Sequence, residues 1–267
     1  MAILTTSREF GSGNMEIARA IIASLNYTFV DKEVLFKEIG AIGGKWEIWA
    51  KELDDSCPSF WEKYDRSFKG FGALLQSIQL RYALQDNVVL RGRGANFLME
   101  GIPHAYRIRV VGLLEDRIER ITMRESVDQE TARWLIEKSD RERAGFVHAL
   151  YGKDVSDPQF YDAVFDKRRQ SLDEIIETVK QTLLARDKLK TDSAQRLLSM
   201  RAVSAKIKAR LIMDPLLYVP ILDVECTQTE LVLRGIVRNS AQYTGIVEAA
   251  RELAGDLPLK VELRYRA

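Results

Sequence analysis

Short apolar runs alternate with segments of helical periodicity over the first two thirds of the chain. The apolar runs have the length of β-strands and lie at 1–7, 26–30, 88–90, 105–113 and 161–165. Between them apolar residues recur every three or four positions, which predicts helices at 15–25, 32–39, 73–83, 116–125, 128–139 and 172–188. Strands that alternate with helices are typical of a parallel sheet, so we predict a three-layer α/β domain with five strands.

Residues 43–72 do not follow this alternation. The segment contains three of the four tryptophans among many charged residues, and Pro58 and Gly70 are expected to break its helices. We interpret it as a helical arm that is inserted into the α/β domain.

The pattern changes after a charge-rich connection at 186–194, which has no apolar face. Beyond it the pattern predicts helix, strand, strand, helix and strand at 194–212, 221–227, 230–237, 240–254 and 259–266. An αββαβ (α+β) unit of about 75 residues is just large enough to bury its own core. We therefore predict two domains, 1–188 and 195–267.

The composition indicates a soluble globular protein without a membrane span. Apolar residues make up 46% of the chain, and no run approaches the roughly 18 apolar residues that cross a bilayer. The N-terminal residues lack the pattern of a secretory signal, so we expect a cytoplasmic location. A formal net charge of +1 gives no broad basic surface for nucleic acid. Two cysteines and two histidines are too few for a disulfide framework or a structural metal site.

A glycine loop joins the first predicted strand to the first helix. Gly11, Ser12 and Gly13 would present backbone N–H groups to an anion, and the N-terminus of the following helix adds a favourable partial charge. Phosphate is the natural ligand of such a loop. A complete P-loop has a lysine and a hydroxyl residue after its last glycine, where this chain has Asn14 and Met15. A plain strand-to-helix turn is therefore the alternative interpretation.

Five arginines lie at predicted strand ends or in a charged segment. Arg8 precedes the glycine loop, and Arg91 and Arg93 follow the strand at 88–90. Because the carboxyl ends of parallel strands share one edge of the sheet, these guanidinium groups could reach one phosphate ligand; solvent exposure is the alternative. Arg141 and Arg143 fall between two predicted helices, where they form either a solvated surface or a mobile lid over a phosphoryl group.

Three segments of the chain carry a more specific signal. They are SREFGSGNMEIARAIIASLNYTFVDKEVL, NVVLRGRGANFL and EKSDRERAGFVHALYGKDVSDPQFYDAVFD. Together and in this order they resemble the cytidylate kinase-like family, P-loop proteins related to nucleoside monophosphate kinases. The resemblance covers about residues 1–185. It implies a parallel five-stranded P-loop kinase-like core, a nucleoside triphosphate site at the glycine loop, an inserted monophosphate-binding arm and an arginine lid.

The resemblance also implies roles for individual residues. It places the donor nucleotide, ATP with Mg²⁺, against Arg8, Gly11, Ser12, Gly13 and Asn14. It makes Asp31 the residue that opens the monophosphate side and Arg93 the contact of the acceptor phosphate. Arg93, Arg141 and Arg143 would then act in catalysis, the last two as lid residues. No residue is expected to form a protein-held metal site.

The chain departs from cytidylate kinases at three positions. These enzymes keep the loop lysine and the following serine or threonine, and they have an acidic residue where Arg91 stands. Either Arg8 supplies the missing positive charge or phosphoryl transfer has been lost. We therefore consider two functions: an ATP-dependent kinase for a CMP- or dCMP-type nucleoside monophosphate, and a degenerate nucleotide-binding sensor.

The last 75 residues resemble a BON domain. The resemblance depends on the αββαβ order and on the strand VLRGIV, in which Gly235 follows alternating leucines. Such domains are thought to bind lipid surfaces, small ligands or other proteins. The small positive net charge of this C-terminal segment is too low for strong membrane attraction. We therefore expect a regulatory or ligand-binding role, with a small ligand or a protein as its partner.

Overall fold

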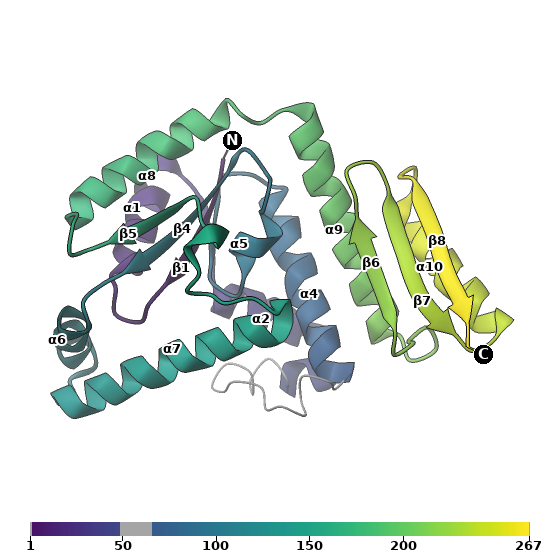
Figure 1. Ribbon diagram of the computed structural model, residues 1–267, viewed down its shortest axis with the longest axis horizontal. Coiled ribbons are helices and arrows are strands. Elements are labelled where there is room, and N and C mark those ends of the chain that lie inside the picture. The colour runs from purple at the N-terminus through teal and green to yellow at the C-terminus, as the bar shows by residue number, and fades with distance from the viewer. Residues whose placement is uncertain (1, 49–65, 267) are drawn as a thin grey trace.

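Five parallel strands form the central sheet in the computed structural model, which describes residues 2–48 and 66–266 (Figure 1). The strands are β1 (Ile3–Arg8), β2 (Thr28–Val30), β3 (Val88–Arg91), β4 (Ala105–Val111) and β5 (Ala163–Asp166). Their order across the sheet is β2-β3-β1-β4-β5, and every pair is parallel. The predicted five-stranded parallel sheet is thereby confirmed.

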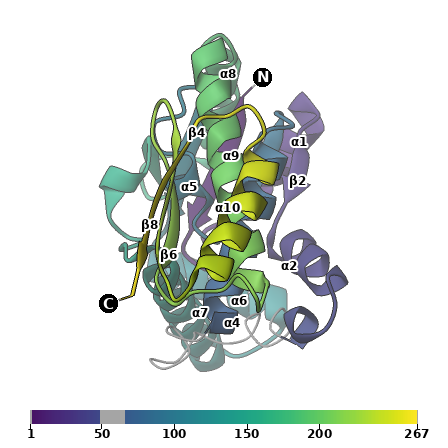
Figure 2. The same cartoon turned by 90° about the vertical axis from the view of Figure 1, so that its right-hand side faces the viewer.

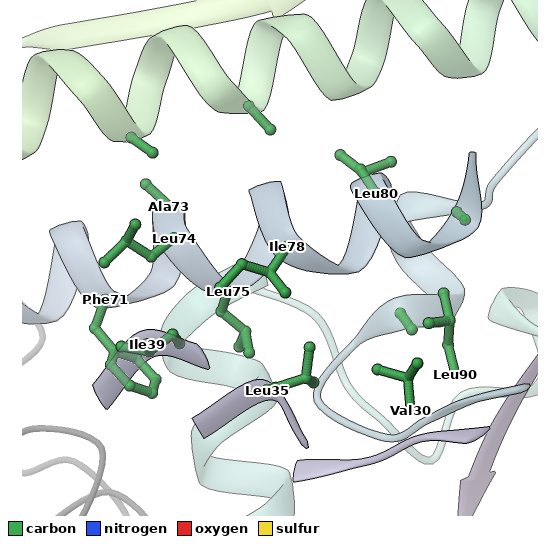
Figure 3. Packing of buried hydrophobic residues seen from close by; sticks show 14 of the residues in the cluster. Val30, Leu35, Ile39, Phe71, Ala73, Leu74, Leu75, Ile78, Leu80 and Leu90 are labelled. Atoms are coloured by element: carbon green, nitrogen blue, oxygen red, sulfur yellow. The ribbon is translucent and has the colours of Figure 1, made fainter. Parts of the chain in front are cut away.

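Helices cover both faces of this sheet. On one face α1 (Asn14–Leu25) and α8 (Leu172–Asp187) pack against alternate residues of β1 and β4. On the other face lie α2 (Lys32–Ala41), α4 (Arg66–Ala83) and the short α5 (Ala95–Leu98). Ile3 and Leu4 are each fully buried, one in each layer, which explains why the strands read as continuous apolar runs. Figure 3 shows Ile39 of α2 beside Phe71 of α4.

The position of β1 between β3 and β4 decides where a ligand can bind. The chain leaves β1 and β3 at the same edge of the sheet, and the Gly92 N–H donates to the Thr6 carbonyl at 2.9 Å. The glycine loop at 9–13 and the turn at 92–94 are therefore neighbours, as predicted. In open α/β sheets ligands bind at such a point of reversed strand order.

Two helix boundaries differ from the sequence prediction. The predicted helix at 128–139 continues to Tyr151, so α7 (Gln129–Tyr151) contains Arg141 and Arg143 and the prediction of a segment between two helices is wrong. Its buried face continues through Phe146, and it ends where Gly152 adopts a left-handed φ of 66°. Before it lies α6 (Leu114–Glu125).

Helix α4 begins at Arg66, seven residues before the predicted start. Gly70 was expected to break the helix but lies inside it. The ring of Trp46 packs against Gly70 in the space that a side chain would fill, and this contact offsets the weak helix propensity of glycine. The remainder of the predicted helical arm, residues 49–65, lies outside the described residues.

The C-terminal elements follow the predicted order of helix, strand, strand, helix and strand. They are α9 (Asp192–Met213), β6 (Leu222–Cys226), β7 (Leu231–Val237), α10 (Ser240–Ala254) and β8 (Leu259–Tyr265). β7 lies in the middle of the sheet, antiparallel to β6 and parallel to β8. Figure 2 shows α10 along one face of this sheet.

Helix α9 lies between α4 and β6 and belongs to two cores (Figure 1). Leu198 and Ile212 pack into the cluster that contains α4, whereas Ile207 and Leu211 pack under the C-terminal sheet. Arg66, the first residue of α4, also donates from Nε to the Ile212 carbonyl at 3.1 Å. The connection between α8 and α9 remains a predicted domain boundary, but the first helix after it is shared. Among the described residues no helix is both long and apolar enough to cross a membrane.

His104 gives the fold a sensitivity to acid. Its side chain is fully buried, and neither ring nitrogen has a hydrogen-bond partner in the described parts of the chain. Burial lowers the pKa of this imidazole from its usual 6.5. The unfolded chain therefore binds the proton more tightly, so stability is full above about pH 6.5 and falls as the pH drops below that value.

We expect His104→Leu to remove much of this fall in stability between about pH 7 and pH 5. The measurement is urea unfolding of both proteins at several pH values. His148→Leu is the matched control, because His148 is exposed on α7 and should leave the pH dependence unchanged. An identical pH dependence for wild type and His104→Leu would contradict the argument.

Candidate functional site

A cavity of about 750 Å³ opens at the carboxyl ends of β1 and β3. Its wall consists of the glycine loop, the start of α1, the turn after β3, the end of α6 and the middle of α7. The basic residues that line it are Arg8, Arg19, Lys32, Arg91, Arg93, Arg120, Arg124 and Arg143. The acidic residues are Glu9, Glu16 and Glu142. This excess of positive charge favours an anionic ligand.

The glycine loop has the backbone shape of an anion cradle. Gly11 and Gly13 have φ angles of 83° and 84°, a left-handed conformation that favours glycine. Gly13 is the N-cap of α1 and offers no side chain to the free N–H groups of the first helical turn. Ser12 and Asn14 are both 2% exposed, and the Ser12 hydroxyl and the Asn14 amide nitrogen have no partner among the described residues. The backbone N–H groups of the loop and these two side chains are thus available as hydrogen-bond donors to an anion.

Asp140 ties the glycine loop to α7. Its carboxylate accepts a hydrogen bond from the Phe10 N–H at 2.7 Å and pairs with both Arg117 and Arg143. Arg117, in turn, donates from Nε to the Phe10 carbonyl at 2.8 Å and pairs with Glu9. Sequence reasoning missed both Asp140 and Arg117. Arg117 could have been found from its position on the buried face of the amphipathic helix α6. Asp140 could not, because it is one of several charged residues in a row.

Of the arginines that line the cavity, Arg91, Arg93 and Arg143 lie close enough to Arg8 for their charges to act on it. Burial is the main cause that lowers the pKa of Arg8 well below its usual value, and the charges of the other three lower it further. Burial likewise lowers the pKa of Arg143 to about 10, with Asp140 acting in the opposite direction. Such crowding of positive groups is unfavourable without a ligand, and an anion between them would relieve it.

Arg93 is held by aromatic rings. Its guanidinium carbon lies 4.9 Å from the ring centre of Phe36 and 4.6 Å from that of Phe146. The residue has a positive φ of 54°, and its carbonyl accepts a hydrogen bond from the Tyr151 hydroxyl at 3.1 Å. Gly94 allows this contact, since a Cβ atom there would overlap the Tyr151 ring. α2 and α7 therefore fix the position of the Arg93 charge.

Asp31 and Arg91 form a pair at the entrance to α2. Asp31 caps this helix by accepting hydrogen bonds from the Glu33 and Val34 N–H groups, a structural role that the sequence analysis did not assign. Its carboxylate lies 3.7 Å from Arg91 Nη2. Asp31 does not line the cavity, so its predicted role in substrate binding remains a prediction.

Arg141 and Arg143 are two residues apart on α7 but differ in their surroundings. Arg143 lines the cavity and donates to the Arg8 carbonyl at 3.3 Å and to the Ser139 hydroxyl at 3.0 Å. Arg141 is exposed and does not line the cavity. The structure therefore brings Arg143 together with the other predicted site residues but not Arg141, and the lid role of both remains a prediction.

A second cavity of about 350 Å³ lies between the glycine loop, α6 and the residue after β5. Gly11 and Ser12 border both cavities, so the loop separates them. Arg120 and Lys167 line the second cavity, together with Asp116 and Glu119. The described residues contain no group of three or more His, Cys, Asp or Glu side chains that could hold a metal ion.

Comparison with known proteins relates this site to a family. The model of the cytidylate kinase-like family matches residues 3–169. The cytidylate kinase of Methanocaldococcus jannaschii is 29% identical over 184 residues, which cover 68% of this chain and 97% of that enzyme. The cytidylate kinase of Methanopyrus kandleri is 28% identical over 179 residues, covering 64% and 86% respectively.

A solved structure supports the fold. An uncharacterized protein from Eubacterium ventriosum superimposes with a TM-score of 0.54 and 19% identity, covering 68% of this chain and 98% of that chain. At this identity the likeness concerns the fold alone. The family match includes the glycine loop, the turn after β3 and all of α7, which are the elements that build the first cavity.

Proposed function

The chain belongs to the cytidylate kinase-like family, and from this premise we propose that it transfers a phosphoryl group from ATP to a CMP- or dCMP-type nucleoside monophosphate. The observation that carries the proposal is the arginine cluster between the glycine loop and the turn after β3. The glycine loop would hold a polyphosphate, and Arg93, in the turn after β3, would contact a second phosphate. Homologous enzymes named cytidylate kinase support the nucleotide as substrate.

Catalysis in such a site consists of positioning and charge stabilisation. The glycine loop would hold the donor phosphates, and Arg93, fixed between two rings, would orient the acceptor phosphate. An acceptor oxygen attacks the γ-phosphorus while the bond from that phosphorus to the bridging oxygen breaks, leaving ADP. Arg143 would neutralise charge on the transferred group, and no covalent intermediate with the protein forms.

Within residues 2–48 and 66–266 no group of three or more His, Cys, Asp or Glu side chains could hold Mg²⁺. The hydroxyl residue expected after the loop is replaced by Met15, and Glu16, the nearest carboxylate of α1, is paired with Arg120 at 2.8 Å. Since magnesium is commonly bound through substrate phosphates, it would arrive with ATP.

A nucleotide-binding sensor is the second candidate function. It is favoured by Asn14 and Met15, because the loop lacks the lysine and the hydroxyl found in active P-loop enzymes. In either case we propose that the C-terminal αββαβ unit is a BON-like regulatory or ligand-binding module. The shared helix α9 and the Arg66 contact to its last turn offer a physical connection between that unit and α4.

One experiment separates the two functions. Purified protein is incubated with ATP, Mg²⁺ and each of CMP, dCMP, UMP, AMP and GMP, and ADP formation is followed by chromatography. We expect ADP and the matching diphosphate with CMP or dCMP, and little ADP without an acceptor. ATP binding measured by calorimetry without turnover on any acceptor would exclude the kinase and favour the sensor. Arg143→Met protein, purified in the same way, controls for contaminating kinases.

A further inference from the structure

The structure brings a lysine to the glycine loop from a distant part of the chain. Lys167 directly follows β5, and its N–H donates to the Val111 carbonyl at 3.2 Å, which fixes the residue at the edge of the sheet where β1 ends. Its Nζ lies 3.1 Å from the position that a Cβ atom on Gly13 would take. The ammonium group therefore lies directly beside the last glycine of the loop.

Lys167 differs from the other cation at this position. Arg120 Nη1 is 2.7 Å from the same point, but this guanidinium is paired with Glu16 at 2.8 Å. Lys167 has no ion pair and no side-chain hydrogen bond within the described ranges of the chain, although the side chain is only partly exposed. Of the two cations beside Gly13, Lys167 is therefore the one without an ion pair among the described residues. Burial, followed by the charge of Arg120, lowers its pKa.

The loop itself indicates that a ligand belongs beside this lysine. The Ser12 hydroxyl and the Asn14 amide nitrogen are buried and unpartnered, and the first turn of α1 has free N–H groups. All of these are donors, apart from the lone pairs of the Ser12 oxygen. Buried donors without partners cost free energy, which an anion at the loop would recover.

We propose that Lys167 supplies the positive charge for the terminal donor phosphates that the glycine loop lacks. The usual P-loop lysine lies in the first turn of the following helix; here that position is Asn14, and the charge comes from the end of β5. Naming the ligand as a nucleoside triphosphate rests on the proposed function. Arg8 is less suited to this task, because its guanidinium lies beside Gly92, in the turn after β3, and not beside Gly13.

The test compares the binding of nucleotides that differ in phosphate number. Calorimetry with ATP and with AMP, both without acceptor, is carried out on wild type, Lys167→Met and Lys167→Arg. Loss of a shielded charged hydrogen bond predicts that Lys167→Met raises the Kd of ATP about tenfold to a hundredfold. The Kd of AMP should change by less than about twofold, because the lost contact concerns the terminal phosphates. Lys167→Arg should recover part of the ATP affinity.

Arg169→Met is the matched control, because Arg169 is exposed two residues further along the same turn. It removes the same charge from the surface and should leave ATP binding unchanged. Unfolding midpoints of all variants verify that the fold is intact.

Three results would overturn the inference: an unchanged ATP affinity in Lys167→Met, equal losses in Lys167→Met and Arg169→Met, or equal losses for ATP and AMP. The proposed function fails separately, since it needs turnover. Protein that shows the ATP-specific loss but transfers no phosphoryl group would keep the role of Lys167 and lose the kinase. Phosphoryl transfer by the wild type together with an unchanged ATP affinity in Lys167→Met would keep the kinase and exclude the role of Lys167.

Discussion

Arg143→Met is expected to lower the rate of phosphoryl transfer about a thousandfold and to weaken ATP binding less than about tenfold. Arg143 lines the cavity from the middle of α7 and is held by Asp140, Ser139 and the Arg8 carbonyl. A guanidinium fixed in this way needs little reorganisation when charge develops on the transferred group. Interactions that strengthen in the transition state affect turnover more than ground-state binding. Steady-state kinetics and ATP calorimetry measure the two quantities.

Arg141→Met provides the comparison within the same helix. Arg141 is exposed and outside the cavity lining, so we expect its replacement to change turnover by less than about twofold. Equal losses in both variants would mean that α7 moves over the site during the reaction, as the predicted lid requires. Proportional losses of turnover and ATP affinity in Arg143→Met would show that this arginine is an ordinary binding residue.

Much of the fold was predictable because its signals are local. β1 carries apolar residues on both faces and is followed by a glycine loop, a combination that predicts a central parallel strand. The error in the start of α4 has a physical cause. Gly70 normally weakens a helix, but the large ring of Trp46 occupies the space that it leaves. Propensity is thus overridden by a packing partner that is distant in the sequence.

The candidate site was predictable only in part. Residues at the ends of β1 and β3 could be brought together in advance, since parallel strands end at one edge of the sheet. Asp140 and Lys167 could not, because their importance depends on contacts across more than a hundred residues, with Phe10 and Gly13 respectively. A charged run gives no indication of which of its members turns inward. This is why Arg141 and Arg143 looked equivalent in the sequence.

The last prediction concerns Arg8, whose charge is unfavourable in the absence of ligand. Burial and three neighbouring arginines lower its pKa, while Asp31 is the acidic group that raises it. A lowered pKa means that the folded state disfavours the charged form of the side chain. Arg8→Met keeps the length of the side chain and removes the charge. We therefore expect the free protein to become more stable, with a thermal midpoint roughly 2–4 °C higher if about 1 kcal/mol of repulsion is removed.

The same variant should bind ATP less tightly. Loss of a shielded phosphate contact would raise the Kd about tenfold to a hundredfold, and stabilisation by bound ligand falls accordingly. The order of stability is then reversed by ligand: Arg8→Met melts above wild type without ATP, and below it at an ATP concentration well above both Kd values. Arg19→Met is the control, because Arg19 lines the same cavity but is exposed, and it should show no such reversal. If Arg8→Met melts below wild type under both conditions, Arg8 stabilises the free fold. The arginines would then not repel one another in the absence of an anionic ligand.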